Sequence, residues 1–191
     1  MYSLPKTFLT PEQYLEIERK AEFKSEYHNG EMFAMAGARL PHNLITTNVT
    51  SELRQQLRLR PCRVVSSDQR VLVAPTGLFT YPDVVVVCGE PRLLDSELDT
   101  LLNPTVIVEV LSPTTEAYDR GRKFGHYRTI ESLSAYLMVA SELISAELYT
   151  RQPDNRWKLT EEASRLEDTF EIESIGCRLK LADIYEKVEL G

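Results

Sequence analysis

The clearest periodicity in the chain is a run of apolar residues at every fourth position: Ile45, Val49, Leu53 and Leu57. This spacing predicts an amphipathic helix over about 41–59. A shorter helix is predicted over about 11–20, because Thr10 is a favoured N-cap, Pro11 suits the first helical position and Gln13 completes a capping box. Both helices would present an apolar face to a core.

Runs rich in valine and other apolar residues predict strands at about 63–66, 70–74, 83–88, 105–111 and 135–140. The run 105–111 is apolar on both alternating faces, which is typical of a strand buried on both sides of a sheet. The pair Asn29-Gly30 predicts a two-residue hairpin, and Pro153-Asp154-Asn155 predicts a second hairpin between 144–150 and 156–160. Helices are expected at 115–129 and 181–187, and a loop or short helix at 90–103.

This order predicts an α/β domain with a mixed sheet flanked by helices, in the sequence αβββαβ, with an added N-terminal hairpin and an added C-terminal hairpin. A chain of 191 residues with 42% hydrophobic residues is long enough for one core. We therefore expect a single domain over 1–191, made of a helix and hairpin (1–40), a central core (41–141) and a C-terminal hairpin and helix (142–191).

Charge and composition limit where the protein can be located and which chemistry its cysteines can support. No apolar run approaches the roughly 20 residues that span a bilayer, and no secretory signal pattern is visible, which together predict a cytoplasmic protein with no membrane contact. The three cysteines lack CxxC spacing, so reduced thiols are expected rather than zinc or disulfide chemistry. The net charge of −7 argues against strong non-specific binding of nucleic acid.

Arginines nevertheless gather between positions 54 and 70. One interpretation is a solvated helix face. The other is that Arg54, Arg58 and Arg63 contact the phosphates of DNA, which would supply affinity without sequence selectivity.

The candidate chemistry begins with Glu109, an acid inside the apolar run 105–111. A carboxylate there must be neutralised, hydrogen-bonded or bound to a metal, because burying it alone is costly. Asp83 opens another apolar strand, and Lys123 follows on the next predicted helix. Two carboxylates that hold Mg²⁺ or Mn²⁺ and one nearby lysine are suited to metal-dependent hydrolysis of phosphodiesters. The alternatives are a structural salt bridge for Glu109 and turn chemistry for Asp83 after Pro82.

In the usual arrangement of this site the lysine lies two residues after the glutamate, but here that position is Leu111. Lys123 offers a replacement from the helix, where Asp119 and Tyr127 share its face at i, i+4 spacing. Gly121 and Gly125 in the same segment weaken a helix by about 1 kcal/mol each. We expect them to permit close packing of this helix on the sheet.

Four further residues have a possible supporting role. Asp119 would be a partner of Lys123 or an exposed helix residue, and Tyr127 lies on the same helix face. Glu31 would be either a polar hairpin residue or an extra acid near the metal. His42 would either cap or pack its helix, or touch the substrate.

These residues, in order, resemble a restriction endonuclease family of the PD-(D/E)xK superfamily, long filed as a domain of unknown function and abundant in cyanobacterial genomes. The resemblance spans nearly the whole chain, and its most specific part is Glu109-Val110-Leu111-Ser112-Pro113 followed by Asp119, Lys123 and Tyr127. The other matching positions are Tyr27, Gly30-Glu31, Ala36-Gly37, His42-Asn43 and Pro82-Asp83. The resemblance implies the PD-(D/E)xK fold with its lysine moved onto the helix.

The combined expectation is an endodeoxyribonuclease in which Asp83 and Glu109 hold Mg²⁺ or Mn²⁺ and Lys123 assists catalysis. A homodimer is expected by analogy with nucleases that pair two sites to cut both strands. One alternative is a catalytically silent module of the same fold that binds nucleic acid or a partner. Another is a hydrolase of a different phosphate substrate, although no Gly-rich phosphate loop supports a nucleotide triphosphatase.

Overall fold

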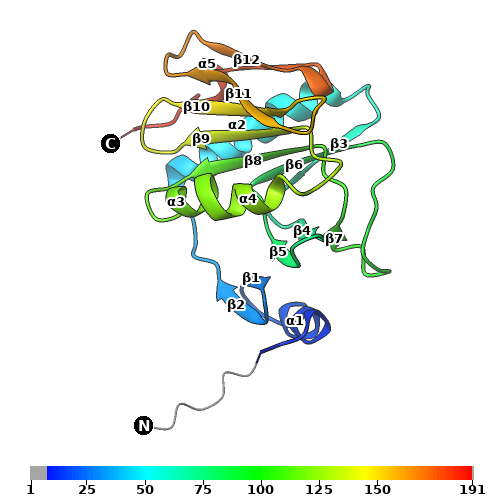
Figure 1. Cartoon of the computed structure of the whole chain (residues 1–191). Coiled ribbons are helices and arrows are strands. Elements are labelled where there is room, and N and C mark those ends of the chain that lie inside the picture. Colours follow the sequence, from blue (N-terminus) through cyan, green and yellow to red (C-terminus); the bar gives the residue numbers. More distant parts are fainter. Residues whose placement is uncertain (1–7, 191) are drawn as a thin grey trace.

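The computed structural model describes residues 8–190, and its secondary structure follows the predicted order closely (Figure 1). The helices are α1 (Pro11–Glu18), α2 (Leu40–Leu57), α3 (Glu116–Tyr118), α4 (Phe124–Tyr127) and α5 (Leu181–Ile184). The first seven strands are β1 (Ser25–His28), β2 (Glu31–Ala34), β3 (Cys62–Ser66), β4 (Arg70–Val73), β5 (Leu78–Thr80), β6 (Val84–Cys88) and β7 (Thr100–Leu101). The others are β8 (Val106–Leu111), β9 (Ala135–Ala140), β10 (Ala146–Arg151), β11 (Trp157–Ala163), β12 (Thr169–Ile172) and β13 (Cys177–Lys180).

The strands form three sheets within the described residues. A six-stranded sheet has the order β11-β10-β9-β8-β6-β3, in which only β8 and β9 run parallel. A five-stranded sheet has the order β2-β1-β5-β4-β7, so the N-terminal hairpin shares a sheet with strands from the middle of the chain. The strands β12 and β13 pair only with each other.

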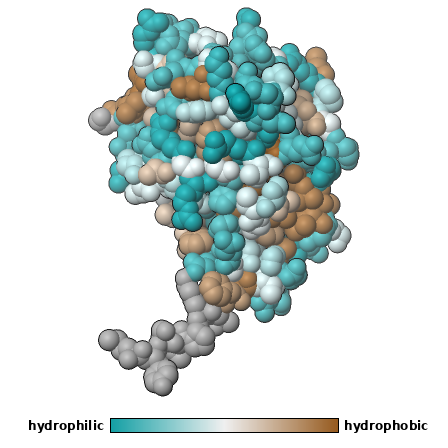
Figure 2. All heavy atoms as spheres, in the orientation of Figure 1, coloured by the Kyte–Doolittle hydropathy of each residue, from teal (hydrophilic) through white to brown (hydrophobic). Residues whose placement is uncertain are grey.

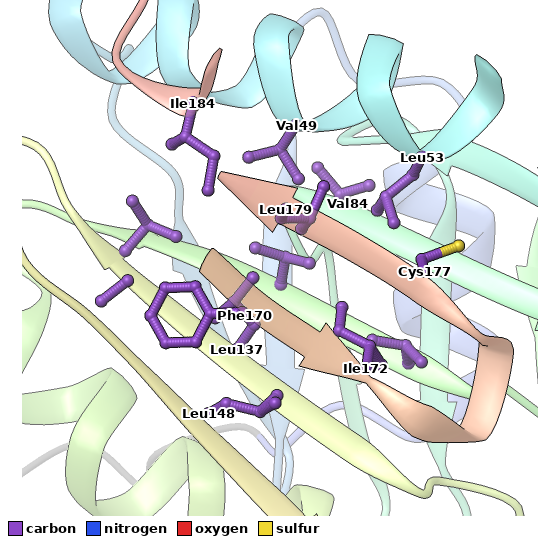
Figure 3. Packing of buried hydrophobic residues seen from close by; sticks show 14 of the residues in the cluster. Val49, Leu53, Val84, Leu137, Leu148, Phe170, Ile172, Cys177, Leu179 and Ile184 are labelled. Carbon is purple, nitrogen blue, oxygen red and sulfur yellow. The ribbon is translucent and has the colours of Figure 1, made fainter. Parts of the chain in front are cut away.

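The large sheet has a hydrophobic layer on each face. On one face the predicted stripe of α2 packs with the alternate β8 residues Val106, Val108 and Val110, and the β12–β13 hairpin and α5 complete this layer. Figure 3 shows Val49 and Leu53 of α2 facing this hairpin across the core. On the other face Ile107 and Leu111 pack with Phe124 and Tyr127 of α4. Glu109 belongs by its alternation to this second face.

Most predicted elements are confirmed, including the capping box of α1 and the Asn29-Gly30 hairpin. Both turn residues adopt positive φ, 50° at Asn29 and 87° at Gly30, as this turn type requires. The hairpin β12–β13 and the short strands β5 and β7 were not predicted. Their sequences are too short, or too mixed in polarity, to show a clear alternation.

The predicted helix 115–129 is helical but not uniform. Between α3 and α4 lies a π-helical segment, Asp119–Lys123, which contains Gly121. The expectation that the two glycines allow close packing is wrong, because a Cβ atom at Gly121 or Gly125 would meet no atom within 4 Å beyond its chain neighbours and the backbone of its own helix. Insertion of a π turn rather than close contact with the sheet distinguishes this segment.

The expected reduced state of the cysteines is corrected at two of three positions. Cys62 and Cys88 are register partners on β3 and β6 and form a disulfide, while Cys177 is free and buried. Residues that are 26 apart in sequence become neighbours only because the two strands pair. The spacing of cysteines along the chain could not show this.

No helix within residues 8–190 is long and apolar enough to cross a membrane. The face of the molecule seen in Figure 2 is largely hydrophilic over its upper part, and hydrophobic surface gathers lower on its right side.

Candidate active site

Glu109 lies in the middle of the large sheet, on β8, and only 4% of its side chain is exposed. Its carboxylate faces the helical segment that follows β8. Glu109 Oε1 accepts a hydrogen bond from Tyr127 Oη at 2.7 Å and lies 2.8 Å from Lys123 Nζ. The buried acid therefore has both a charged partner and a neutral donor.

Lys123 is equally buried and is surrounded by acids. Its ammonium lies 2.8 Å from Glu109 Oε1, 3.4 Å from Glu26 Oε1 and 3.5 Å from Asp119 Oδ1. Glu109 comes from β8, Glu26 from β1, and Asp119 from the preceding turn of the lysine's own helical segment. Three parts of the chain thus converge on one ammonium group.

Asp83 lies next to this cluster, immediately before β6. The β6–β8 register pairs Val84 with Val108, and its continuation by one residue places Asp83 opposite Glu109. Side chains directly opposite each other in an antiparallel pair have Cβ atoms about 4.5–5.5 Å apart. Asp83 Oδ2 also accepts the N–H of Val110 at 2.8 Å, which holds the carboxylate at the edge of β8.

His42, in the first turn of α2, reaches the same place. Its Nε2 lies 3.3 Å from Asp83 Oδ2, and its Nδ1 is buried with no hydrogen-bond partner among the described residues. Burial alone would lower the pKa of His42, but hydrogen bonding and charge from Asp83, with help from the Val110 backbone, outweigh it and raise the pKa. The imidazole is therefore held as a donor to Asp83 rather than as a cap of its helix.

Burial and oppositely charged neighbours have opposing effects on the pKa values of Glu109 and Lys123. Burial, with the negative charges of Asp119 and Asp83, raises the pKa of Glu109 well above its ordinary value, despite the opposing effect of Lys123. Burial likewise raises the pKa of Asp119. Burial alone would lower the pKa of Lys123, but the acids Glu109, Glu26 and Asp119 outweigh it and raise this pKa well above its ordinary value. Lys123 is therefore the fixed positive charge of the site.

Tyrosine and threonine hydroxyls complete the cluster. Tyr118 Oη donates to Glu26 Oε2 at 3.3 Å, and the Thr80 hydroxyl donates to Glu26 Oε1. Burial raises the pKa of Tyr118 to about 12 and that of Tyr127 well above its ordinary value. Both phenols therefore stay neutral donors to carboxylates at physiological pH.

Comparison with known proteins places this chain in a family. The sequence pattern of the Uma2 family, described as "Putative restriction endonuclease", matches residues 11–182. The chain belongs to the Uma2 family.

Two relatives of this Uma2 chain come from Synechocystis sp. (strain ATCC 27184 / PCC 6803 / Kazusa). "Uncharacterized protein sll1609" is 37% identical over 153 residues, which cover 80% of this chain and 86% of that protein. "Uncharacterized protein slr1290" is 36% identical over 184 residues, which cover 96% of this chain and 94% of that protein. The similarity therefore extends over nearly the full length of both proteins in the second case.

A crystal structure from Anabaena variabilis ATCC 29413, described as "a putative nuclease belonging to DUF820", resembles this chain with a TM-score of 0.76. The two sequences are 16% identical, and the match covers 95% of this chain and 99% of that chain. At this identity the likeness shows the fold. The mixed-sheet, restriction-endonuclease-like fold expected from the sequence is thereby confirmed.

The position two residues after Glu109 is part of the apolar core. Leu111 shares the face of β8 that carries Glu109, but it is 3% exposed and packs in the apolar layer with Phe124. Lys123, Asp119 and Tyr127 all reach Glu109 or one another from the helical segment opposite. The structure therefore brings together Glu109, Asp119, Lys123 and Tyr127, all of which the sequence pattern had indicated.

Glu26 was missed by the sequence analysis, which considered Glu31 as the acid of the N-terminal hairpin. Glu31 begins β2 and pairs with His28, whereas Glu26 is buried against Lys123. No sequence signal pointed to Glu26, because the run Ser25–His28 has no apolar alternation and the burial of Ser25, Glu26 and Tyr27 is seen only in the structure. The partner of Glu26 is Lys123, which lies almost a hundred positions later in the sequence.

The arginines proposed for DNA contact lie away from this cluster. Arg54 and Arg58 are exposed on α2, 12 and 16 residues beyond His42, or about 18 and 24 Å along a helix. Arg63 pairs with Val87 on β6, four residues beyond Asp83, or about 13 Å along a strand. All three side chains are exposed, but Arg63 shares the sheet face of Val65 and Val87, which is opposite the face that α2 covers.

The donor atoms of the site suit a hard divalent cation. Within residues 8–190 no group of three or more histidine, cysteine, aspartate or glutamate side chains is arranged to hold a metal ion. Asp83 and Glu109 supply two carboxylates, and the contacts above use Oδ2 of Asp83 and Oε1 of Glu109, not the second oxygen of either. Magnesium is commonly held by one or two carboxylates and keeps several waters, so this donor set fits it.

Proposed function

We propose that this chain is a metal-dependent endonuclease that hydrolyses phosphodiester bonds of DNA. The observation that carries the proposal is the position of the Lys123 ammonium, 2.8 Å from Glu109, with Asp83 anchored on the next residue of the same strand. The description of the family as a putative restriction endonuclease supports the same activity.

The residues would divide the work between them. Asp83 and Glu109 would hold Mg²⁺ or Mn²⁺, which when bound polarises the scissile phosphate and lowers the pKa of water. Lys123 would donate a hydrogen bond to the attacking water or to the phosphate oxygen where negative charge grows. Asp119 and Tyr127 would hold Lys123 and Glu109 in place. His42 would orient Asp83 through its Nε2.

Addition and removal of metal test this proposal. Purified protein incubated with supercoiled plasmid should nick or linearise it when Mg²⁺ or Mn²⁺ is added, and not in EDTA. Titration calorimetry with Mn²⁺ should show binding in the absence of DNA. If the protein shows no cleavage and no Mn²⁺ binding, the result would favour the catalytically silent binding module. The burial of Glu109 and Lys123 is compatible with that alternative as well.

DNA contact by Arg54, Arg58 and Arg63 has its own expected result. If each neutralises one phosphate, the triple alanine variant should bind DNA more weakly, and the slope of log affinity against log salt should fall by about three units. A matched control replaces three exposed basic residues of the C-terminal strands, Arg156, Lys158 and Arg178. Equal slopes in the two variants would mean that Arg54, Arg58 and Arg63 are solvated surface residues without a role in DNA binding.

A homodimer belongs to the same proposal. Two chains related by a two-fold axis would place one active site on each strand of a duplex, so that both strands are cut in one complex. Sedimentation of the protein on a short duplex should then show two copies per DNA molecule.

A further inference from the structure

Glu26 stands out among the partners of Lys123 because it comes from outside the central core. It lies on β1 of the N-terminal hairpin and is 8% exposed. Its Oε1 lies 3.4 Å from Lys123 Nζ and accepts the Thr80 hydroxyl, and its Oε2 accepts Tyr118 Oη at 3.3 Å. Each carboxylate oxygen of Glu26 therefore has a defined partner.

The three acids around Lys123 are not equivalent. Glu109 would share its carboxylate with a bound cation, and Asp119 lies at the longest distance, 3.5 Å, on the lysine's own segment. Glu26 is tied to Thr80 and Tyr118 and has no contact with Asp83 among the described interactions. The Glu26 carboxylate can therefore remain a partner of the Lys123 ammonium when Glu109 binds a cation.

We propose that Glu26 is a positioning residue that holds the Lys123 ammonium beside Glu109, so that the N-terminal hairpin is part of the active site. The inference rests on the proposed function, and it extends the site from the central core to β1. It predicts that a change at Glu26 acts on catalysis through Lys123 and leaves metal and DNA binding in place.

A purely structural role for Glu26 is the competing explanation, since a buried acid can simply dock one sheet on another. Glu18 provides the matched control. It is a second buried glutamate of the N-terminal segment, 7% exposed, and it accepts the Ser25 N–H and Tyr81 Oη, each at 2.8 Å. It anchors the same segment without a contact to Lys123.

The first measurement compares Glu26→Gln with Glu18→Gln. Glu26→Gln keeps an oxygen for the Thr80 hydroxyl but removes the charge, so kcat should fall about 10–100-fold, as is typical when an outer partner of a metal site is lost. KM for DNA and the Mn²⁺ dissociation constant should change little. Glu18→Gln should keep the parent kcat even where it lowers the melting temperature. Glu26→Asp, which retains the charge but shortens the reach, should also lose kcat.

The second measurement needs no nuclease activity. Lys123 is 5% exposed, so reductive methylation followed by mass spectrometry should leave it unmodified in the parent, while Lys20 on the surface of α1 is modified. In Glu26→Gln the ammonium should become reactive, and in Glu18→Gln it should stay protected. An inactive parent would end the nuclease proposal while this result still tests Glu26. Equal kcat in both variants, or unchanged protection of Lys123, would make Glu26 a structural anchor only.

Discussion

Replacement of Lys123 by alanine should lower kcat for DNA cleavage by about 10²–10³, the usual cost of removing one preorganised donor from a site where charge develops. The reason is geometric. The ammonium is held by three acids at 2.8–3.5 Å and lies directly beside Glu109, so its charge is already in place before the reaction. Mn²⁺ binding should not weaken, because Lys123 competes with the cation for Glu109 rather than supporting it.

The same substitution removes the counter-charge of buried acids, so stability must be measured with activity. Breaking a buried ion pair by deleting one partner costs about 3–5 kcal/mol. Activity is therefore compared at a temperature where circular dichroism shows the variant and the parent equally folded. Arg122→Ala, which removes an exposed cation from the neighbouring position, is the control.

A transferred lysine sharpens the test. Leu111 occupies the position two residues after Glu109 and shares its face of β8. Leu111→Lys in the Lys123→Ala background should restore part of the lost kcat if the charge, and not the helix that carries it, matters. Cleavage by Lys123→Ala at the parent rate would end the idea that this lysine serves the reaction.

Replacement of Glu109 by glutamine should abolish metal binding and cleavage together while the fold survives. We expect Mn²⁺ affinity to fall at least about 100-fold, the upper end of the loss seen for outer-shell partners of metal ligands. The amide keeps an oxygen for Tyr127 and removes a charge that the buried site disfavours. Because burial raises the pKa of Glu109 in the folded protein, the ionised carboxylate opposes folding at neutral pH. Glu26 and Asp119 still pair with Lys123 in this variant, so no buried charge is left without a partner, and the melting temperature should hold or rise.

This combination separates a metal ligand from a structural salt bridge. If Glu109 served only to pair with Lys123, Glu109→Gln would leave any Mn²⁺ binding and any cleavage unchanged. The control is Glu147→Gln, which removes a partly buried acid that pairs with Arg120 at 2.7 Å. Calorimetry and thermal unfolding of the two variants, side by side, give the answer.

Local sequence determined the elements that carry the site. The apolar stripe of α2, the capping box of α1 and the Asn29-Gly30 turn each depend on interactions between residues close in sequence. They can therefore be predicted without knowledge of the tertiary structure. The same holds for Glu109, since an acid in a doubly apolar strand requires a partner wherever that strand lies. The helical spacing of Asp119, Lys123 and Tyr127 was visible for the same reason.

Tertiary structure alone decided which partners those residues meet. The β6–β8 register sets Asp83 against Glu109, and strand pairing joins Cys62 to Cys88 against the expectation from spacing. The contact between Glu26 and Lys123 spans 97 positions and exists only because β1 enters a sheet with β5, which carries Thr80. Contacts of this kind depend on how sheets pack, and no pattern within a short stretch of sequence encodes them. Local sequence therefore indicates most of the candidate site residues, and only folding brings them together with their partners.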